Sequence, residues 1–222
     1  MTARLLVFDV DGTLVDSQAQ ILAAIAQAFA AHRLDCPPRE RVLSIVGLSL
    51  PQAIAELLPQ TDVALHAELA RAYRESFSTL RALETSPLYP GAREVLERLA
   101  GQTDWILGVA TGKSRRGLDH VIAAHGLGGL FRTMQVADDH PSKPHPAMLR
   151  AALAETGADP AGAVMIGDTT YDISMGRAAG TRALGVAWGY HPPAALSQAG
   201  ADQVIDDFAA LIPALDRLWE VA

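Results

Sequence analysis

Acidic residues follow an apolar run near the start of the chain, in the stretch LLVFDVDGTLVDS at residues 5–17. The run is typical of a buried strand, yet it ends at Asp9, Asp11 and Asp16. Acids are poor strand formers and are costly to bury unless something pairs with them. The acids therefore either cap a following helix or hold a cation and do chemistry.

Polar residues also follow three later apolar runs. WILGVAT ends at Thr111, directly before Gly112, and FRTMQVAD is followed by a proline-flanked turn that contains Lys143. AVMIGDT carries Asp168, with Asp172 four residues later. Ligands of open α/β sheets bind outside the carboxyl ends of the strands, so we expect these residues to converge with Asp9 and Asp11 at one edge.

Such a collection of side chains suits the handling of a phosphate. Clustered carboxylates raise one another's pKa unless a cation intervenes, and hard oxygen ligands without a His and Cys set favour Mg²⁺. A hydroxyl, a lysine ammonium and the N–H groups of helix N-termini after glycine turns would hold the phosphate oxygens. The pattern indicates phosphoryl transfer, in which positioning and charge neutralisation dominate catalysis.

The elements that position these residues can be inferred from the hydrophobic pattern. From about residue 86, strand-like and helix-like segments alternate, which predicts a Rossmann-like α/β core with a parallel sheet covered on both faces. Residues 16–85 show only helical periodicity, with apolar residues four apart. The members of this pattern are Ile21, Ile25, Phe29, Leu65, Leu69, Tyr73 and Phe77. We therefore expect a core at 1–15 and 86–222 and a small all-helical cap at 16–85.

Composition narrows the classes of partner. The chain has 222 residues, 50% of them apolar, which suffices for a sizeable core. A net charge of −7 argues against nucleic acid or an anionic membrane as the main partner. No apolar stretch reaches the length of a membrane span, and the single cysteine, Cys36, allows no intramolecular disulfide. We expect a cytoplasmic protein that is a monomer or homodimer.

The ordered motifs carry a family resemblance. Asp9-Val10-Asp11-Gly12-Thr13, then Thr111, then Lys143, then Gly167-Asp168-x-x-x-Asp172 resemble the four motifs of the haloacid dehalogenase superfamily, in that order. The helical block resembles the type-1 cap of that superfamily, and the whole chain is similar to its phosphoglycolate-phosphatase-like branch. A lone GDxxxD match is weak evidence, but the ordered combination at strand ends is specific.

The resemblance implies a role for each motif residue. Asp9 would be the nucleophile that forms an aspartyl-phosphate, and Asp11 the general acid and then base. An extended chain would point Asp11 to the same side as Asp9. The substrate phosphate would be bound by Thr111, Gly112 and Lys143. The Mg²⁺ ligands would be Asp9, the backbone carbonyl of Asp11, Asp168 and Asp172.

Several residues keep a structural alternative. Asp172 could instead be a first-turn acid favoured by the helix dipole, although the metal role is preferred, and Asp16 and Ser17 are more typical of a helix N-cap. Lys113 could be a surface charge. Asp138 and Asp139 could be caps or site residues. The segment 46–50 could be a specificity loop or an ordinary helix connection.

The sequence thus predicts a Mg²⁺-dependent phosphatase that acts on a small phosphorylated metabolite, with phosphoglycolate as one candidate. Two alternatives share its chemistry. A sugar phosphomutase would use the same nucleophile behind a cap that excludes water. A receiver-type signalling domain would also use Asp, Thr and Lys with Mg²⁺, but would be about half as long. A dinucleotide-binding module is disfavoured because no GxGxxG follows the first strand.

Overall fold

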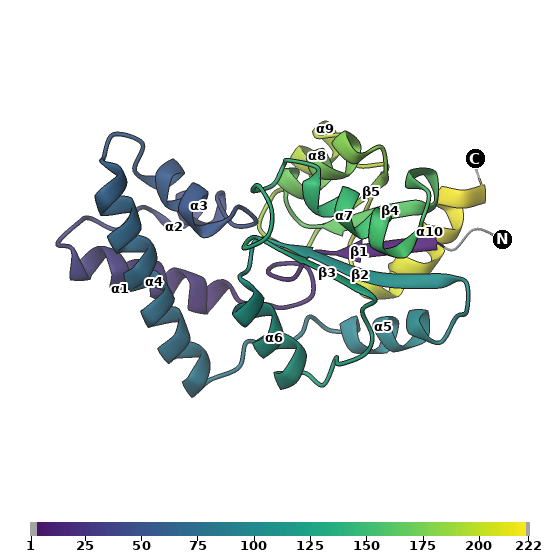
Figure 1. Ribbon diagram of the computed structural model, residues 1–222, viewed down its shortest axis with the longest axis horizontal. Coiled ribbons are helices and arrows are strands. Elements are labelled where there is room, and N and C mark those ends of the chain that lie inside the picture. The colour runs from purple at the N-terminus through teal and green to yellow at the C-terminus, as the bar shows by residue number, and fades with distance from the viewer. Residues whose placement is uncertain (1–3, 221–222) are drawn as a thin grey trace.

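The protein contains a six-stranded parallel sheet, described here from a computed structural model that covers residues 4–220. The strand order is β3-β2-β1-β4-β5-β6, with β1 at the centre between β2 and β4 (Figure 1). The predicted α/β fold class is confirmed. The strands are β1 (Arg4–Phe8), β2 (Trp105–Thr111), β3 (Thr133–Val136), β4 (Ala163–Gly167), β5 (Arg182–Val186) and β6 (Gln203–Ile205).

Helices cover both faces of this sheet. Side chains alternate along β1, so Leu6 and Phe8 pack with α5, α6 and α10, whereas Leu5 and Val7 pack with α7 and α8. Both sets are fully buried, and each such side chain contributes about 1.5–3 kcal/mol. The helices of this unit are α5 (Ala92–Ala100), α6 (Arg115–Ala124), α7 (Ala147–Thr156), α8 (Thr170–Ala179), α9 (Pro193–Gln198) and α10 (Leu211–Glu220).

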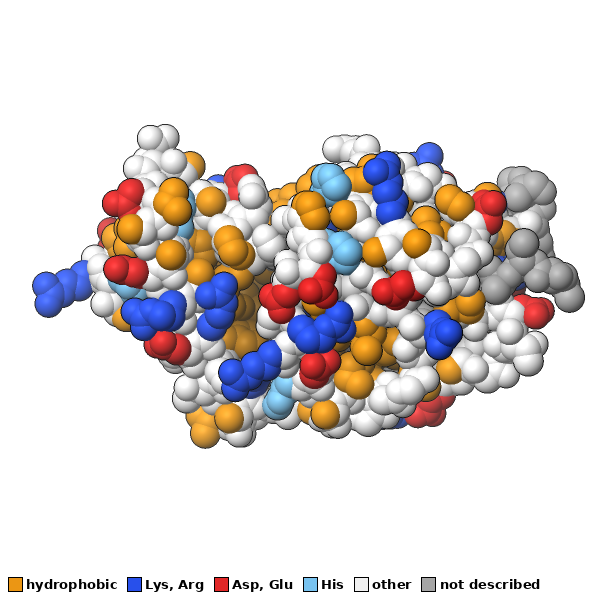
Figure 2. All heavy atoms as spheres, viewed as in Figure 1, with side chains coloured by type: hydrophobic (Ala, Val, Ile, Leu, Met, Phe, Trp, Pro, Cys, Tyr) orange, Lys and Arg blue, Asp and Glu red, His pale blue; other side chains and the backbone are white. Residues whose placement is uncertain are grey.

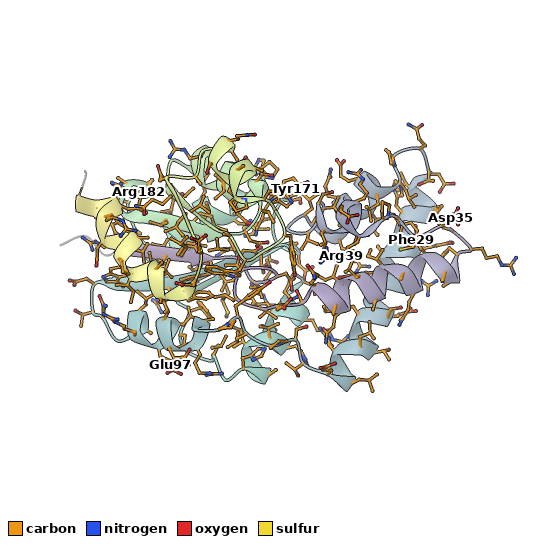
Figure 3. All side chains as sticks on the ribbon, turned by 180° about the vertical axis from the view of Figure 1, so that it is seen from behind. Phe29, Asp35, Arg39, Glu97, Tyr171 and Arg182 are labelled. Carbon is orange, nitrogen blue, oxygen red and sulfur yellow. The ribbon has the colours of Figure 1, made fainter. Side chains whose placement is uncertain are left out.

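The segment between β1 and α5 is helical and has a hydrophobic cluster of its own. Phe29, Ile54 and Leu69 are fully buried in this cluster, and Figure 3 shows Phe29 among the helices. The four helices extend away from the end of the sheet, as Figure 1 shows. They are α1 (Gln18–Ala31), α2 (Arg39–Leu43), α3 (Leu50–Leu57) and α4 (Val63–Leu83).

Two chain crossings join the helical segment to the sheet, and they pair with each other. The Asp16 N–H donates to the Pro87 carbonyl and the Tyr89 N–H donates to the Leu14 carbonyl, each at 2.9 Å. We propose that these crossings separate two domains at the predicted boundaries. Residues 16–85 are called the cap below, and the rest of the chain is called the core.

The first strand ends at Phe8, and Asp9 is the first residue beyond it. The segment at 193–198 forms the short helix α9 with Pro193 in its first turn, where proline is tolerated. No helix among residues 4–220 is both long and apolar enough to cross a membrane.

Candidate active site

The ends of the three central strands bring the predicted residues together. The Asp9 N–H continues the β1–β4 ladder by donating to the Ile166 carbonyl at 2.9 Å. Asp9 therefore lies beside Asp168, which directly follows β4, and Thr111 ends the neighbouring β2. All three side chains are buried. The parallel topology thus accounts for this convergence.

Three buried carboxylates form a compact cluster. Asp9, Asp168 and Asp172 each offer an oxygen within 4.8 Å of the others. The Asp168 carboxylate is held from two sides, by the Thr13 hydroxyl at 2.8 Å and by the Tyr190 backbone N–H at 2.9 Å. These donors hold Asp168 in one orientation toward the cluster.

Lys143 is the cation of this cluster. Its ammonium lies 2.6 Å from Asp172 Oδ1 and 3.0 Å from Asp9 Oδ1, and its side chain is fully buried. The other Asp172 oxygen accepts from the Thr169 hydroxyl at 2.6 Å and from the Thr169 backbone N–H at 3.1 Å. The Asp172 N–H in turn donates to Thr169 Oγ1, which completes a capping box at the start of α8. Asp172 is therefore both a first-turn helix acid and a member of the carboxylate cluster.

The pKa values of the cluster reflect burial first and neighbouring charges second. Burial raises the pKa of Asp9 to about 7; Lys143 opposes this rise, and Asp172 adds to it. Burial, reinforced by Asp172 and Asp9, holds the pKa of Asp168 well above its usual range. Burial alone would lower the pKa of Lys143, but Asp172 and Asp9 raise it above its ordinary value. The one ammonium does not compensate three carboxylates.

The cluster fits a hard divalent cation. Both Asp9 oxygens are buried without a well-formed hydrogen bond to any described residue, and Oδ2 has no ion-pair partner either. An uncompensated buried carboxylate oxygen is costly unless a further cation is present. Carboxylate oxygens are the ligands Mg²⁺ prefers. Asp9, Asp168 and Asp172 are the side chains that could hold it.

Asp11 lies outside that carboxylate cluster. Its two oxygens each accept from Lys113 Nζ at 2.7 Å, and Oδ1 also accepts from the Ser17 hydroxyl. The Leu14 and Val15 N–H groups close a turn onto the Val10 carbonyl, and Asp11 lines the same pocket as Asp9. Asp11 is still near enough that its charge contributes to raising the pKa of Asp9.

Of the two helix-start residues, Ser17 has a different role from the one expected. Ser17 is at the N-cap position of α1, but its side chain makes no cap bond and contacts Asp11 and the Tyr190 hydroxyl instead. Asp16 is exposed and accepts from the Gln18 N–H at 3.4 Å. The N-cap prediction is therefore wrong for the Ser17 side chain.

The turn after β2 presents Thr111 and Gly112 to the pocket. Ser114 is the N-cap of α6 and accepts from the Gly117 N–H. The Thr111 side chain is therefore not used to cap this helix. Asp138 accepts from the Arg115 N–H at 2.7 Å and Asp139 pairs with the Arg115 side chain, so these acids stabilise the start of α6.

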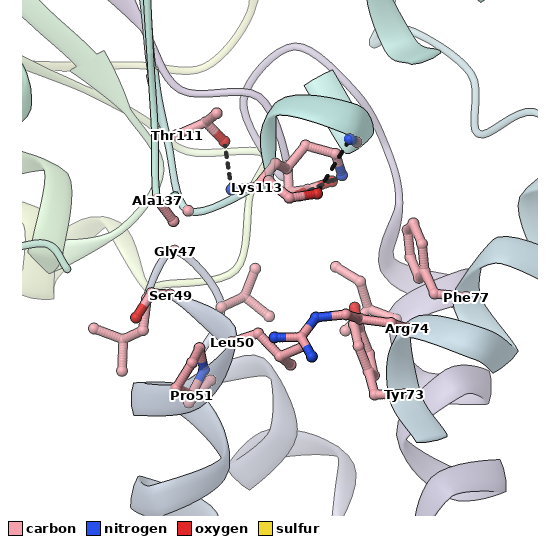
Figure 4. A pocket seen from close by; sticks show the side chains of 18 of the residues that line it. Gly47, Ser49, Leu50, Pro51, Tyr73, Arg74, Phe77, Thr111, Lys113 and Ala137 are labelled. Carbon is pink, nitrogen blue, oxygen red and sulfur yellow. Dashed lines mark hydrogen bonds and ion pairs between the residues drawn. The ribbon is translucent and has the colours of Figure 1, made fainter. Parts of the chain in front are cut away.

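A pocket of about 330 Å³ lies between the core and the cap, and Asp9, Asp11 and Thr111 line it from the core. The segment 46–50 lines it from the cap (Figure 4), and the Ser49 N–H donates to Ser142 Oγ of the core at 2.8 Å. Figure 2 shows apolar side chains inside the hollow between the two parts, with Lys and Arg side chains beside it. The segment 46–50 is thus a helix connection that also forms a pocket wall.

Sequence reasoning did not assign three residues that hold the site. Thr13 and the Tyr190 backbone N–H donate to Asp168, and the Ser17 hydroxyl donates to Asp11 and contacts the Tyr190 hydroxyl. Lys113 was left as a possible surface charge, yet its side chain is only 9% exposed. The available signal was position: Lys113 follows β2 and Tyr190 follows β5, both at the carboxyl edge of the sheet.

Comparison with known proteins agrees with this geometry. The profile of the haloacid dehalogenase-like hydrolases matches residues 6–186. This chain belongs to that family. It is 34% identical over 220 residues to a phosphoglycolate phosphatase of Haemophilus influenzae, covering 96% of this chain and 98% of the relative. It is also 34% identical over 224 residues to a probable phosphatase, IndB, of Dickeya dadantii, covering 98% of this chain and 96% of the relative.

A solved structure shows the same architecture. A hydrolase from Pseudomonas syringae superposes with a TM-score of 0.86 at 25% identity, over 97% of this chain and 98% of the other. The predicted membership of the phosphoglycolate-phosphatase-like branch, and the prediction of a haloacid dehalogenase-like phosphatase, are confirmed. The receiver-type alternative is excluded by the family match.

Proposed function

We propose that this haloacid dehalogenase-like hydrolase is a Mg²⁺-dependent phosphatase that hydrolyses a small phosphate monoester through an aspartyl-phosphate on Asp9. The observation that carries the proposal is the buried Asp9 carboxylate with an unpartnered Oδ2, placed at a strand end beside a second and third carboxylate. The pocket of about 330 Å³ above it suits a small metabolite. Phosphoglycolate, the substrate in the name of one relative, is a candidate.

In the first half-reaction, an Asp9 oxygen attacks phosphorus and the bond from phosphorus to the leaving oxygen breaks. Asp11 supplies a proton to that leaving oxygen. Lys113 and Ser17 hold the Asp11 carboxyl group in the lining of the pocket.

In the second half-reaction, water attacks the phosphorus of the aspartyl-phosphate and the Asp9 oxygen leaves. Asp11, now ionised, takes the proton from that water. Lys143 holds Asp9 in place and offsets part of the charge near the phosphoryl group. Thr111 and the Gly112 backbone would bind the phosphoryl oxygens from the side of β2.

Bound Mg²⁺ would neutralise charge on Asp9 and on the phosphate. Asp9 and Asp168 would hold it directly. Asp172 would contribute through water, because one of its oxygens is paired with the Lys143 ammonium and the other accepts two bonds from Thr169, whereas each Asp168 oxygen accepts only one bond. The carbonyl of Asp11 completes the proposed ligand set.

The test is phosphate release from a panel of phosphate monoesters by the purified chain. The proposal predicts catalytic release that EDTA abolishes and Mg²⁺ restores. Accumulation of free phosphate over many turnovers distinguishes a phosphatase from a sugar phosphomutase. Undiminished turnover in EDTA would reject the metal, and no turnover on the panel would reject this substrate class.

A further inference from the structure

The cap side of the pocket carries only positive charge, whereas the core side carries both signs, with Lys113 beside the acids. The acidic residues that line it, Asp9, Asp11 and Asp138, all come from the core. The part contributed by α4 contains Arg74 and Arg81 and no acidic residue, and Arg116 of α6 lies at the same rim. A phosphate monoester without a further charge would use only the core side.

These three arginines lack an ionic partner. Among the ion pairs of residues 4–220, none involves Arg74, Arg81 or Arg116. By contrast, Arg71 lies one turn before Arg74 on the same helix, outside the pocket lining, and pairs with Glu75 at 3.1 Å. Burial and the nearby Arg116 lower the pKa of Arg81, as expected where cations face each other without an acid.

Arg74 is the arginine whose position is most specific. Figure 4 shows its side chain extending from α4 across the pocket toward Leu50, on the side opposite Thr111 and Lys113. The nearby walls are apolar and come from Leu50, Pro51 and Phe77. A guanidinium between apolar walls is suited to bidentate recognition of a carboxylate or phosphate.

We propose that Arg74 binds a second anionic group on the substrate, so that the enzyme selects small organic phosphates that carry a carboxylate or a further phosphate. This inference rests on the proposed phosphatase function and adds the substrate class to it. Arg81 and Arg116 contribute positive potential at the same rim. The phosphoryl group would lie at Asp9 while the second anion faces the cap.

The kinetic test compares 2-phosphoglycolate with ethyl phosphate, which has a similar size and no carboxylate. The wild-type protein should prefer 2-phosphoglycolate in kcat/KM. Arg74→Gln should reduce the ratio of the two kcat/KM values by about tenfold or more, mainly through KM for 2-phosphoglycolate. The ratio for Arg74→Lys should lie between those of the wild type and Arg74→Gln, because a lysine keeps the positive charge but lacks the planar guanidinium fork. The matched control, Arg71→Gln, should keep the wild-type ratio.

A binding test does not depend on turnover. Calorimetry with Mg²⁺ present should show phosphonoacetate binding more tightly than ethylphosphonate, and Arg74→Gln should remove about tenfold or more of that difference. If the wild-type protein releases no phosphate but shows this binding pattern, the phosphatase proposal fails and the second-anion site holds. Equal binding of the two phosphonates, or an unchanged kcat/KM ratio in folded Arg74→Gln, overturns the inference.

Discussion

Lys113 Nζ lies 2.7 Å from both carboxylate oxygens of Asp11. The sequence contains only two lysines, and the second, Lys143, lies between Asp9 and Asp172. Each lysine thus pairs with one acid of the DVDGT motif. Lys113 also lies 5.2 Å from the ring centroid of Phe77 of the cap, so this ion pair adjoins the surface where cap and core meet.

Replacement of Lys113 tests whether it positions Asp11. We expect Lys113→Met to lower kcat at least about tenfold, because general acid–base catalysis contributes roughly 10²–10⁴ and depends on a held carboxyl group. The measurement is steady-state phosphate release, with circular dichroism to confirm folding. Arg150→Met, on an exposed part of α7, is the control and should retain wild-type kcat. A kcat near wild type for Lys113→Met would show that Asp11 does not depend on this pair.

Replacement of Lys143 should affect both stability and turnover. We expect Lys143→Met to lower the free energy of unfolding by about 3–5 kcal/mol, since it leaves Asp9 and Asp172 buried without their cation. Urea unfolding in EDTA measures this loss. The double variant Lys143→Met/Asp172→Asn should lose less free energy of unfolding than the two single variants lose together. A loss of less than about 1 kcal/mol in the free energy of unfolding of Lys143→Met would contradict the claim that Lys143 compensates buried charges.

The fold and the strand-end residues followed from the sequence for physical reasons. Strands buried on both faces read as continuous apolar runs, and polar residues directly after such runs meet at one edge. Asp9, Thr111 and Asp168 could therefore be placed together before the structure was known. Lys143 does not follow a strand directly, but the turn after FRTMQVAD placed it at the same edge, and the family resemblance supplied its role.

The contacts of Ser17, Lys113 and Arg74 could not be predicted from the sequence. Ser17 has the residue type and position of an N-cap, and only the turn at residues 10–15 brings Asp11 within reach of its hydroxyl. Arg74 is next to Tyr73, part of the apolar stripe of α4, but the stripe does not specify which side of the helix faces the core. The Lys113–Asp11 contact joins residues 102 positions apart, and the position of Arg74 depends on the placement of the cap against the core, so both are long-range properties.

Proton uptake by Asp9 should compete with Mg²⁺. Its pKa is raised from 3.8 to about 7, so the metal-free fold is favoured by protonation at low pH and loses that stabilisation as pH rises through about 7. Mg²⁺ needs the ionised carboxylate. The rise in Tm on adding Mg²⁺ should therefore be larger at pH 8 than at pH 5. An equal rise in Tm at both pH values would show that Mg²⁺ binding does not depend on the ionisation of Asp9.

Gly112 should control the approach of the cap. A Cβ on Gly112 would lie 2.6 Å from the Leu48 carbonyl oxygen and 2.7 Å from that of Gly47, which is closer than real Cβ contacts allow. We expect Gly112→Ala to displace the segment 46–50 and raise KM by about tenfold or more, the equivalent of 1.4 kcal/mol. Gly128→Ala is the control, because its Cβ would meet nothing within 4 Å. Wild-type KM in a folded Gly112→Ala protein would exclude this segment from substrate binding.

The central claim is that Asp9 carries the phosphoryl group during turnover. The most direct measurement is acid quenching of the protein during hydrolysis of a ³²P-labelled substrate, followed by mapping of the protein-bound label. The account predicts label on Asp9 in the wild-type protein, and neither label nor turnover in a folded Asp9→Asn variant. Label on another residue, or phosphate release near the wild-type rate from Asp9→Asn, would contradict it.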